Sequence, residues 1–225
     1  WSVNWAVPSD GMARRNTREL ILETSLRLFN EFGEPNVTTN HIADEAGISP
    51  GNLYYHFRSK DDIVLDLFKR FLVRFQPLLD IPDTARLQPE DLWLQLHLSF
   101  ELKGEFRFLY RNLSDLAARI PNFDRAMRAT LARERQAVHT ILSGLEKAGA
   151  MQADADEQEH LAEAVLLSLT YWIPFAELFE PGGLEDSTVQ VRAMARVMLM
   201  TAPWLREPER DQFRMLARAY LAQPR

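Results

Sequence analysis

Residues 38–57 read TTNHIADEAGISPGNLYYHF, a pattern that predicts two short helices joined by a tight turn. A threonine at the start of this stretch supplies a hydroxyl that can accept a hydrogen bond from the free N–H groups of a first helical turn. Gly47 stands where the end of that helix requires a positive φ, and Ser49 followed by Pro50 is a typical start for the next helix. The stretch therefore predicts a helix-turn-helix unit.

The second of these short helices has one apolar and one polar face. Leu53 and Phe57 are four residues apart and are expected to face the core. The remaining positions point elsewhere: Gly51, Asn52, Tyr54, Tyr55 and His56. Tyrosine hydroxyls can donate to phosphates, an asparagine can contact a base edge or a phosphate, and such a helix enters the DNA major groove. A two-helix corner in any all-α protein has the same pattern, so spacing alone leaves both interpretations open.

The residues of this stretch closely resemble the DNA-binding segment of the TetR family of bacterial transcriptional regulators. The resemblance rests on these positions: Thr38-Thr39, Ile42-Ala43, Ala46-Gly47, the run from Gly51 to Phe57, Lys60, and upstream Ile21-Leu22, Leu28-Phe29 and Phe32-Gly33. It covers roughly Arg14 to Phe75, and within the family this segment looks most like regulators of the PhaD type. The resemblance implies an all-α fold with an N-terminal helix-turn-helix domain and a C-terminal domain for ligand binding and dimerisation.

The resemblance also implies DNA-binding roles by position. Phosphate contacts are expected from Thr39, Tyr54, Tyr55 and Lys60; proximity to base edges from Ser49, Pro50, Gly51 and Asn52; and contact with the DNA backbone from His56, with Thr38 and Asn40 completing the set. Pro50 stands where many relatives carry a polar or basic residue, so one base contact is expected to be apolar or missing.

Composition restricts the class of protein further. The 225 residues can bury one or two cores, and the chain has 9 glycines, little strand-type alternation and no cysteine. An all-α fold is therefore expected, a disulfide scaffold or thiol redox sensor is excluded, and a reducing cytoplasm is the expected compartment. The net charge of −6 argues against a broadly basic nucleic-acid protein, and residues 14–60 have balanced charges. DNA binding should therefore have a modest salt dependence.

Proline spacing marks the expected domain boundary. Pro77, Pro82 and Pro89 follow a long helix that begins near Ser59 and ends near Phe75. We expect a tag remnant or disordered extension over residues 1–13, the DNA-binding domain over 14–76, and the effector-binding and dimerisation domain over 77–225. Further helices are expected at residues 14–32, 90–103, 106–120, 121–148, 155–179, 186–202 and 207–221.

Two of these helices, 155–179 and 186–202, are apolar around most of their circumference. Either the monomer has a large core, or each subunit contributes both helices to a four-helix bundle about a two-fold axis. The family resemblance implies the dimer, which matches a palindromic operator. No membrane span is expected, because the most apolar window contains Glu163, Glu177 and Pro174.

The sequence shows no convincing catalytic set, metal site or cofactor motif. Glu157 and His160 have the spacing of half a di-iron site, but only one copy occurs, in an acidic run that suits the start of a helix. The other histidines show no metal-ligand spacing. The competing hypothesis from another class is a small-molecule carrier or α-helical enzyme with a vestigial helix-turn-helix head.

A regulator of this kind needs an effector pocket, and pockets are mostly apolar with a few polar anchors. The predicted lining is Trp93, Leu96, His97, Phe100, Phe108, Tyr110, Asn112, Ser168, Tyr171, Trp172 and Phe175. Ordinary core packing is the alternative for each aromatic residue. The expected effector is a small apolar molecule with one polar or anionic end, such as an acyl or aromatic acid derivative. The sequence thus predicts an effector-released repressor that binds a palindromic operator as a homodimer.

Overall fold

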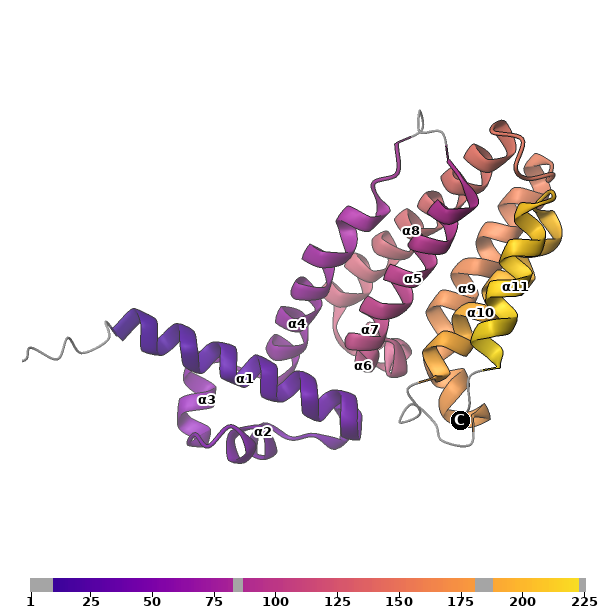
Figure 1. The fold of residues 1–225 in the computed structure, drawn as a ribbon. Coiled ribbons are helices and arrows are strands. Elements are labelled where there is room, and N and C mark those ends of the chain that lie inside the picture. The colour runs from indigo at the N-terminus through magenta and orange to yellow at the C-terminus, as the bar shows by residue number, and fades with distance from the viewer. Residues whose placement is uncertain (1–9, 83–86, 181–187, 223–225) are drawn as a thin grey trace, which may run out of the picture. The chain divides into compact units, whose positions relative to one another are not determined.

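The computed structural model describes residues 10–82, 87–180 and 188–222, and the regular elements in these ranges are helices, as expected (Figure 1). Side chains are described from Asn16 onward. The chain forms two compact units, one up to Arg70 and the other from Phe71 onward. The division lies inside a continuous helix, N-terminal to the boundary expected after residue 76.

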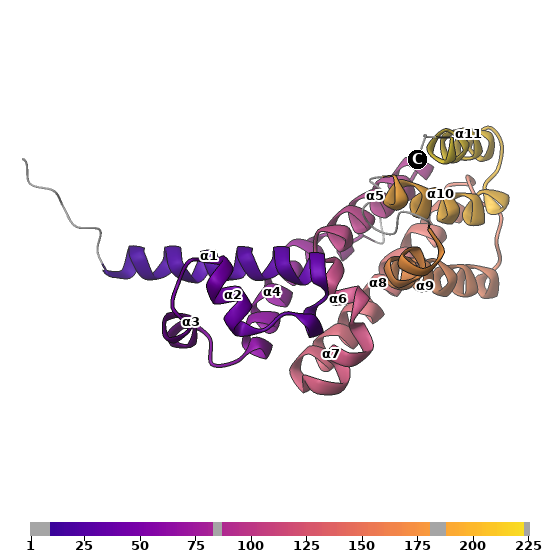
Figure 2. The same cartoon turned by 90° about the horizontal axis from the view of Figure 1, so that it is seen from below.

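The first unit is a small helical domain. It contains α1 (Asp10–Phe32), η1 (Glu34–Asn36), α2 (Thr39–Glu45), α3 (Pro50–His56) and the first part of α4 (Lys60–Phe75). Figure 2 shows α2 and α3 on the same side of α1. Its buried core includes Ile21, Leu28, Phe29, Ile42, Leu53 and Ile63. Residues 10–13, which we expected outside the fold, belong to α1, whereas residues 1–9 lie outside the described residues.

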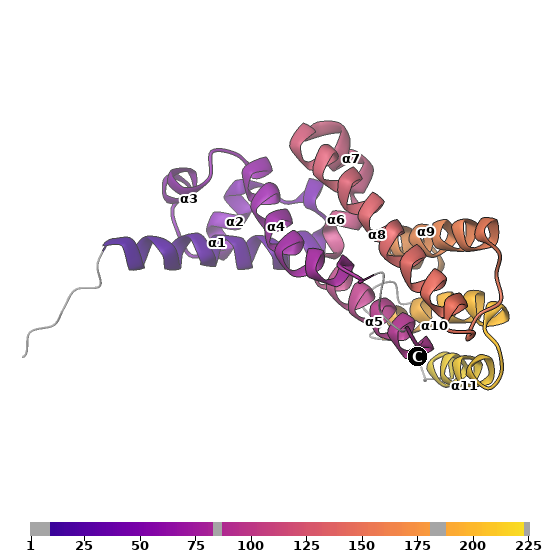
Figure 3. The same ribbon diagram turned by 90° about the horizontal axis from the view of Figure 1, so that it is seen from above.

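The second unit is a larger helical bundle. Its elements are η2 (Gln76–Leu79), α5 (Pro89–Glu105), α6 (Arg107–Arg111), α7 (Leu113–Arg119), α8 (Pro121–Lys147), α9 (Ala155–Phe179), α10 (Val189–Thr201), η4 (Ala202–Trp204) and α11 (Glu209–Leu221). Helix α8 packs on α9, and Figures 2 and 3 show α10 between α9 and α11. An ion pair between Arg74 and Glu105 joins the end of α4 to α5.

Two helix predictions were wrong in detail. The helix expected over residues 106–120 is divided at Asn112, whose φ of −113° and ψ of 25° leave the helical range. Asparagine competes for backbone hydrogen bonds and is a weak helix former, but the apolar spacing does not show this break. The helix expected over residues 90–103 extends to Glu105, so Gly104 lies within α5.

Helices α9 and α10 differ in how fully the subunit covers them. Helix α10 has α9, α11 and α5 against it, whereas α9 leaves a row of large apolar side chains exposed: Leu167, Tyr171, Phe175, Leu178 and Phe179. By length and composition alone α9 is apolar enough to cross a membrane, which the sequence analysis did not expect. One face of α9 is buried against α8, so core packing explains the apolar residues on that face.

Candidate nucleic-acid interface

The two short helices of the first unit begin and end as their local sequence predicts. The Thr38 hydroxyl accepts a hydrogen bond from the backbone N–H of His41 at 3.1 Å and caps α2. Gly47 has a φ of 65° directly after that helix. The Ser49 hydroxyl then accepts from the N–H of Asn52 at 3.2 Å and caps α3, whose first residue is Pro50. These local bonds fix the turn between the helices.

Helix α3 has a buried face and an exposed face. Leu53 is fully buried and Phe57, just past the helix, is 3% exposed, whereas Tyr54 and Tyr55 are 49% and 63% exposed. The predicted base-edge residues are also exposed: Ser49, Pro50, Gly51 and Asn52. A short helix that is anchored by apolar residues on one side therefore presents two large hydroxyl-bearing rings on the other.

The exposed hydroxyls of α2 and α3 are joined. Thr39 Oγ1 and Tyr54 Oη are 2.9 Å apart and share a hydrogen bond between the first residue of α2 and the middle of α3. The ring of Tyr55 lies edge-on to that of His56, with centroids 5.2 Å apart. Two of the four predicted phosphate contacts, Thr39 and Tyr54, are therefore adjacent on the surface. Asn40 is exposed beside them in the first turn of α2.

Lys60 makes contacts that the sequence did not predict. Its Nζ donates to the backbone oxygens of Glu34 and Val37, both at 2.9 Å, and lies 3.1 Å from the Glu34 carboxylate. An ammonium has three donors. Two of the three donate to backbone oxygens and the ammonium also pairs with the Glu34 carboxylate, so the phosphate contact assigned to Lys60 would require some of these contacts to be released. The residue instead holds the segment before α2 against the start of α4.

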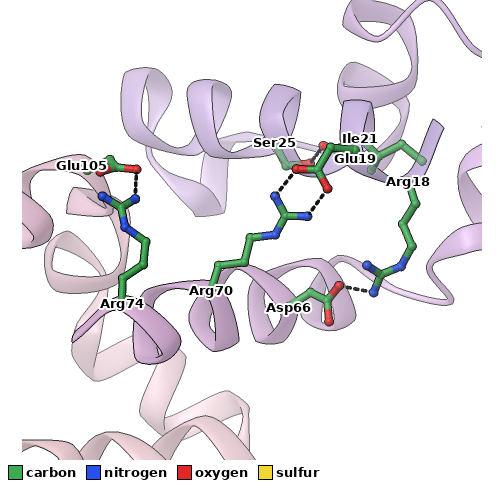
Figure 4. A network of polar contacts seen from close by, with 8 residues as sticks. All are labelled: Arg18, Glu19, Ile21, Ser25, Asp66, Arg70, Arg74 and Glu105. Carbon is green, nitrogen blue, oxygen red and sulfur yellow. Dashed lines mark hydrogen bonds and ion pairs between the residues drawn. The ribbon is translucent and has the colours of Figure 1, made fainter. Parts of the chain in front are cut away.

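Two ion pairs in the first unit join α1 to α4 (Figure 4). Arg70 on α4 donates to both carboxylate oxygens of Glu19 on α1, at 2.5 and 2.6 Å. Arg18 pairs with Asp66 one turn earlier on α4. The Arg70 guanidinium holds the pKa of the Glu19 carboxyl below its usual range. Sequence reasoning missed these pairs because the partners lie far apart along the chain.

The predicted effector residues form three groups in the second unit, and the rings of Phe100 and Trp172, whose centroids are 5.6 Å apart, join the second group to the third. Trp93 and His97 stack on α5 with ring centroids 5.2 Å apart, and Trp93 Nε1 donates to the Tyr220 hydroxyl at 3.3 Å. Five others lie on α5, on α6 or between α6 and α7: Leu96, Phe100, Phe108 and Tyr110 are buried, and Asn112 is half-buried. The third group belongs to α9.

Ser168, Tyr171, Trp172 and Phe175 line a groove of about 310 Å³ between α9 and α10. The groove is predominantly apolar, and Arg196 from α10 lies across it, with its guanidinium 5.7 Å from the Phe175 ring centroid. Arg196 also pairs with Glu180 and holds the pKa of that carboxyl below its usual range. Several lining residues belong to the exposed apolar row of α9.

The acidic run before His160 forms a helix start, as the sequence analysis favoured. The Asp154 side chain accepts from the Glu157 N–H at 2.9 Å, and the Glu157 side chain accepts from the Asp154 N–H at 2.8 Å. This reciprocal capping box begins α9. His160 Nδ1 is 2.7 Å from the backbone oxygen of Asp156.

Comparison with known proteins identifies the family. A family model described as bacterial regulatory proteins of the tetR family matches residues 21–67, and a model described as a bacterial transcriptional repressor matches residues 70–213. A TetR-family transcriptional regulator from Marinobacter aquaeolei VT8 has a crystal structure that is 33% identical over 91% of this chain and 98% of that one, with a TM-score of 0.81. The chain belongs to the TetR family. It is a DNA-binding transcriptional regulator, and its helix-turn-helix is α2 and α3.

More distant relatives agree with this assignment over shorter spans. The transcriptional repressor KstR2 of Mycolicibacterium smegmatis is 28% identical over 121 residues, which is 52% of this chain and 58% of that protein. A Staphylococcus aureus USA300 regulator is 36% identical over 70 residues, which is 29% of this chain and 38% of that protein. A triclosan complex of SmeT shows the same fold at 18% identity over 86% of this chain and 93% of that one, with a TM-score of 0.57. The likeness to PhaD-type regulators stays a prediction.

Proposed function

We propose that this TetR-family regulator represses transcription by binding a palindromic operator as a homodimer, and that a small effector bound in the second unit releases it. The observation that carries the DNA-binding surface is the exposure of Tyr54 and Tyr55 on a helix whose opposite face is buried. Large rings at such positions contribute little to the core. Their hydroxyls suit phosphate oxygens, which receive most protein–DNA hydrogen bonds. The chain acts by binding, with no chemical step.

Each exposed residue has a role in this proposal. Thr39, Tyr54 and Tyr55 bind phosphates, and the shared hydrogen bond of the first two orients their hydroxyls before DNA arrives. Gly51 and Asn52 lie nearest the base edges, because the N-terminal residues of a recognition helix make those contacts. Lys60 supports this surface through its bonds to Glu34 and Val37. Few cations contact the duplex, so the salt dependence is modest.

The exposed apolar row of α9 is the proposed dimer surface. Leu178 is 93% exposed, and Tyr171 and Phe175 border the groove with α10. Contiguous apolar surface of this kind marks an interaction site, and a two-fold axis pairs the same patch on both subunits. The axis also gives the two half-sites of a palindrome their symmetry. This proposal assigns the groove to the partner subunit rather than to the effector.

Effector release requires two states of the dimer. An effector that binds better to the state with mismatched recognition helices shifts the population toward that state, and DNA weakens effector binding by the same factor. The SmeT–triclosan complex and a choline complex of a Saccharomonospora viridis regulator, 21% identical with a TM-score of 0.64, share this fold and support a ligand-binding role for the second unit.

Operator binding is tested with the DNA upstream of this gene. Fluorescence anisotropy should show tight binding to one fragment and much weaker binding to a shuffled fragment of equal length. Asn52→Ala should reduce the difference in affinity between the two fragments, because losing a base contact costs about 1–3 kcal/mol of discrimination between sequences. Equal affinity for both fragments in the wild-type protein contradicts sequence-specific repression.

Dimerisation is tested by placing a charge on the proposed surface. Phe175→Glu should give a monomer by sedimentation and weaken operator binding. Met215→Glu is the matched control, because Met215 is an exposed apolar residue on α11, away from the groove. A Phe175→Glu protein that remains a dimer, or a Met215→Glu protein that dissociates, contradicts the assignment.

A further inference from the structure

The interior of the second unit contains a fully buried pair of opposite charges. Lys103 on α5 and Glu134 on α8 are both shielded from solvent. Lys103 Nζ lies 2.8 Å from one oxygen of Glu134 and 2.7 Å from the other, and it donates to the backbone oxygen of Leu169 on α9 at 3.1 Å. The pair therefore ties three helices together at the centre of the bundle. Burying two charges is expensive, and such a pair is often no better for stability than apolar residues.

Hydrogen-bonding capacity beside this pair is unused. The Tyr110 hydroxyl is buried and has no hydrogen-bond partner among the described residues. Glu134 Oε1, although close to Lys103, is not reached by a hydrogen bond of good geometry. Burial, and then the Glu134 charge, raises the pKa of the Tyr110 phenol well above its usual value, so the hydroxyl stays a neutral donor. Native proteins leave few buried polar groups unsatisfied, and each one calls for a cause.

Aromatic rings surround these polar groups. Lys103 Nζ lies 4.9 Å from the Tyr110 ring centroid and 5.5 Å from that of Phe75. Phe71 packs edge-on against Tyr110 at 5.9 Å and stacks on Phe75 at 4.8 Å. The cluster thus surrounds two polar groups with aromatic rings: a hydroxyl without a partner among the described residues, and a carboxylate oxygen held only by its ion pair. A few converging polar groups among apolar side chains are what orient a ligand in small-molecule sites.

We propose that Tyr110, Lys103 and Glu134 are the polar anchor of the effector site, and that the effector carries an uncharged hydroxyl on an apolar body. The inference rests on the proposed effector function of the second unit. A hydroxyl both donates and accepts, so it serves Glu134 Oε1 and the Tyr110 hydroxyl together. The charges of the site are already balanced. A carboxylate would add an unpaired buried charge, which is costly. The structure therefore favours an alcohol or phenol over the acid expected from the sequence.

The test uses two matched probes, 4-phenylbutan-1-ol and 4-phenylbutanoate, and thermal unfolding of the full chain without DNA. The alcohol should raise the melting temperature and the carboxylate should not. In Tyr110→Phe the dissociation constant of the alcohol should rise about tenfold, the effect of one hydrogen bond. Tyr220→Phe, which removes a hydroxyl on α11 that bonds Trp93 Nε1 and has no part in the proposed site, should respond like the wild type.

Four results overturn the inference: no shift with the alcohol at millimolar concentration, equal or tighter binding of the carboxylate, an undiminished response of Tyr110→Phe, or a lost response in Tyr220→Phe. The ligand-free proteins give a further test. Because the Tyr110 hydroxyl has no partner among the residues that the structure describes, Tyr110→Phe should keep the wild-type melting temperature. A fall of several degrees would show that protein or water already satisfies the hydroxyl and would contradict the inference. Operator release is scored separately: alcohol binding without release contradicts the proposed function but supports the site.

Discussion

Each unit of the molecule contains a lysine–glutamate pair, and the two pairs differ in burial and in how completely their polar groups are hydrogen-bonded. The Lys60 side chain is 20% exposed, whereas Lys103 and Glu134 are fully buried. In the first unit, Lys60 divides its three donors between the Glu34 carboxylate and two backbone oxygens. In the second, the Lys103–Glu134 pair leaves one carboxylate oxygen without a well-formed bond and lies beside the unpartnered Tyr110 hydroxyl. A pair whose polar atoms are all hydrogen-bonded has none left for a ligand, whereas an incompletely bonded pair could still bond one.

The difference matches what each unit does. The first unit presents a surface to DNA and must hold that surface in one geometry, so its buried polar groups are used up internally. In the proposed function the second unit responds to a small molecule. A ligand that supplies the missing hydrogen bonds to partly satisfied buried groups stabilises the protein, whereas fully satisfied groups gain nothing from a ligand. The predictions below test this contrast.

The largest effect is expected at the fully buried pair. Lys103→Met leaves the Glu134 charge without its partner in the interior, which should cost about 3–5 kcal/mol in the free energy of unfolding measured with urea. Lys103→Met combined with Glu134→Leu removes both charges and should recover most of that loss. A single variant as stable as the wild type contradicts the burial of this pair.

A smaller effect is expected at Lys60, because its side chain is 20% exposed. Lys60→Met should lower the free energy of unfolding by about 2 kcal/mol, as for a hydrogen-bonded charge. The slope of log affinity against log salt for the operator should stay at the wild-type value. If Lys60 instead contacts a phosphate, stability is kept and the slope falls by about 1.

The smallest effect is expected at the exposed pair of Glu19 and Arg70. Because Arg70 lowers the folded-state pKa of Glu19, this carboxyl stabilises the fold above its unfolded pKa, and the contribution is lost as the pH falls through the lower folded value. Glu19→Gln should therefore be slightly less stable than the wild type at neutral pH, with the gap closing below about pH 4. A gap that is constant with pH rules out the carboxylate as its source.

Local chemistry explains which features the sequence predicted. The caps at Thr38 and Ser49 and the positive φ at Gly47 each depend on a few neighbouring residues, so the pattern of residues 38–57 contains them fully. The division of α3 into Leu53 on one face and the tyrosines on the other follows from helical spacing. The exposed face of α3 was therefore predictable from the sequence, whereas the internal contacts of Lys60 were not.

Contacts between distant segments explain what was missed. Lys60 meets Glu34 and Lys103 meets Glu134 only after several helices have packed, and no spacing rule connects them. The sequence placed aromatic and polar residues of α5, α6 and α9 in one pocket. Helical periodicity shows which residues are apolar but not which helices face one another, so it could not show that Trp93 contacts Tyr220 of α11 while Phe100 contacts Trp172 of α9.

The most direct test of the central claim is the operator affinity of the Tyr54→Phe/Tyr55→Phe double variant, measured beside its melting temperature. The two hydroxyls are the proposed phosphate contacts, and phenylalanine keeps the rings. We predict that affinity falls about 10- to 100-fold on operator and shuffled DNA alike, with only the small fall in melting temperature expected from losing the exposed Thr39–Tyr54 hydrogen bond. Wild-type affinity in this double variant would show that the exposed face of α3 does not bind DNA through these residues.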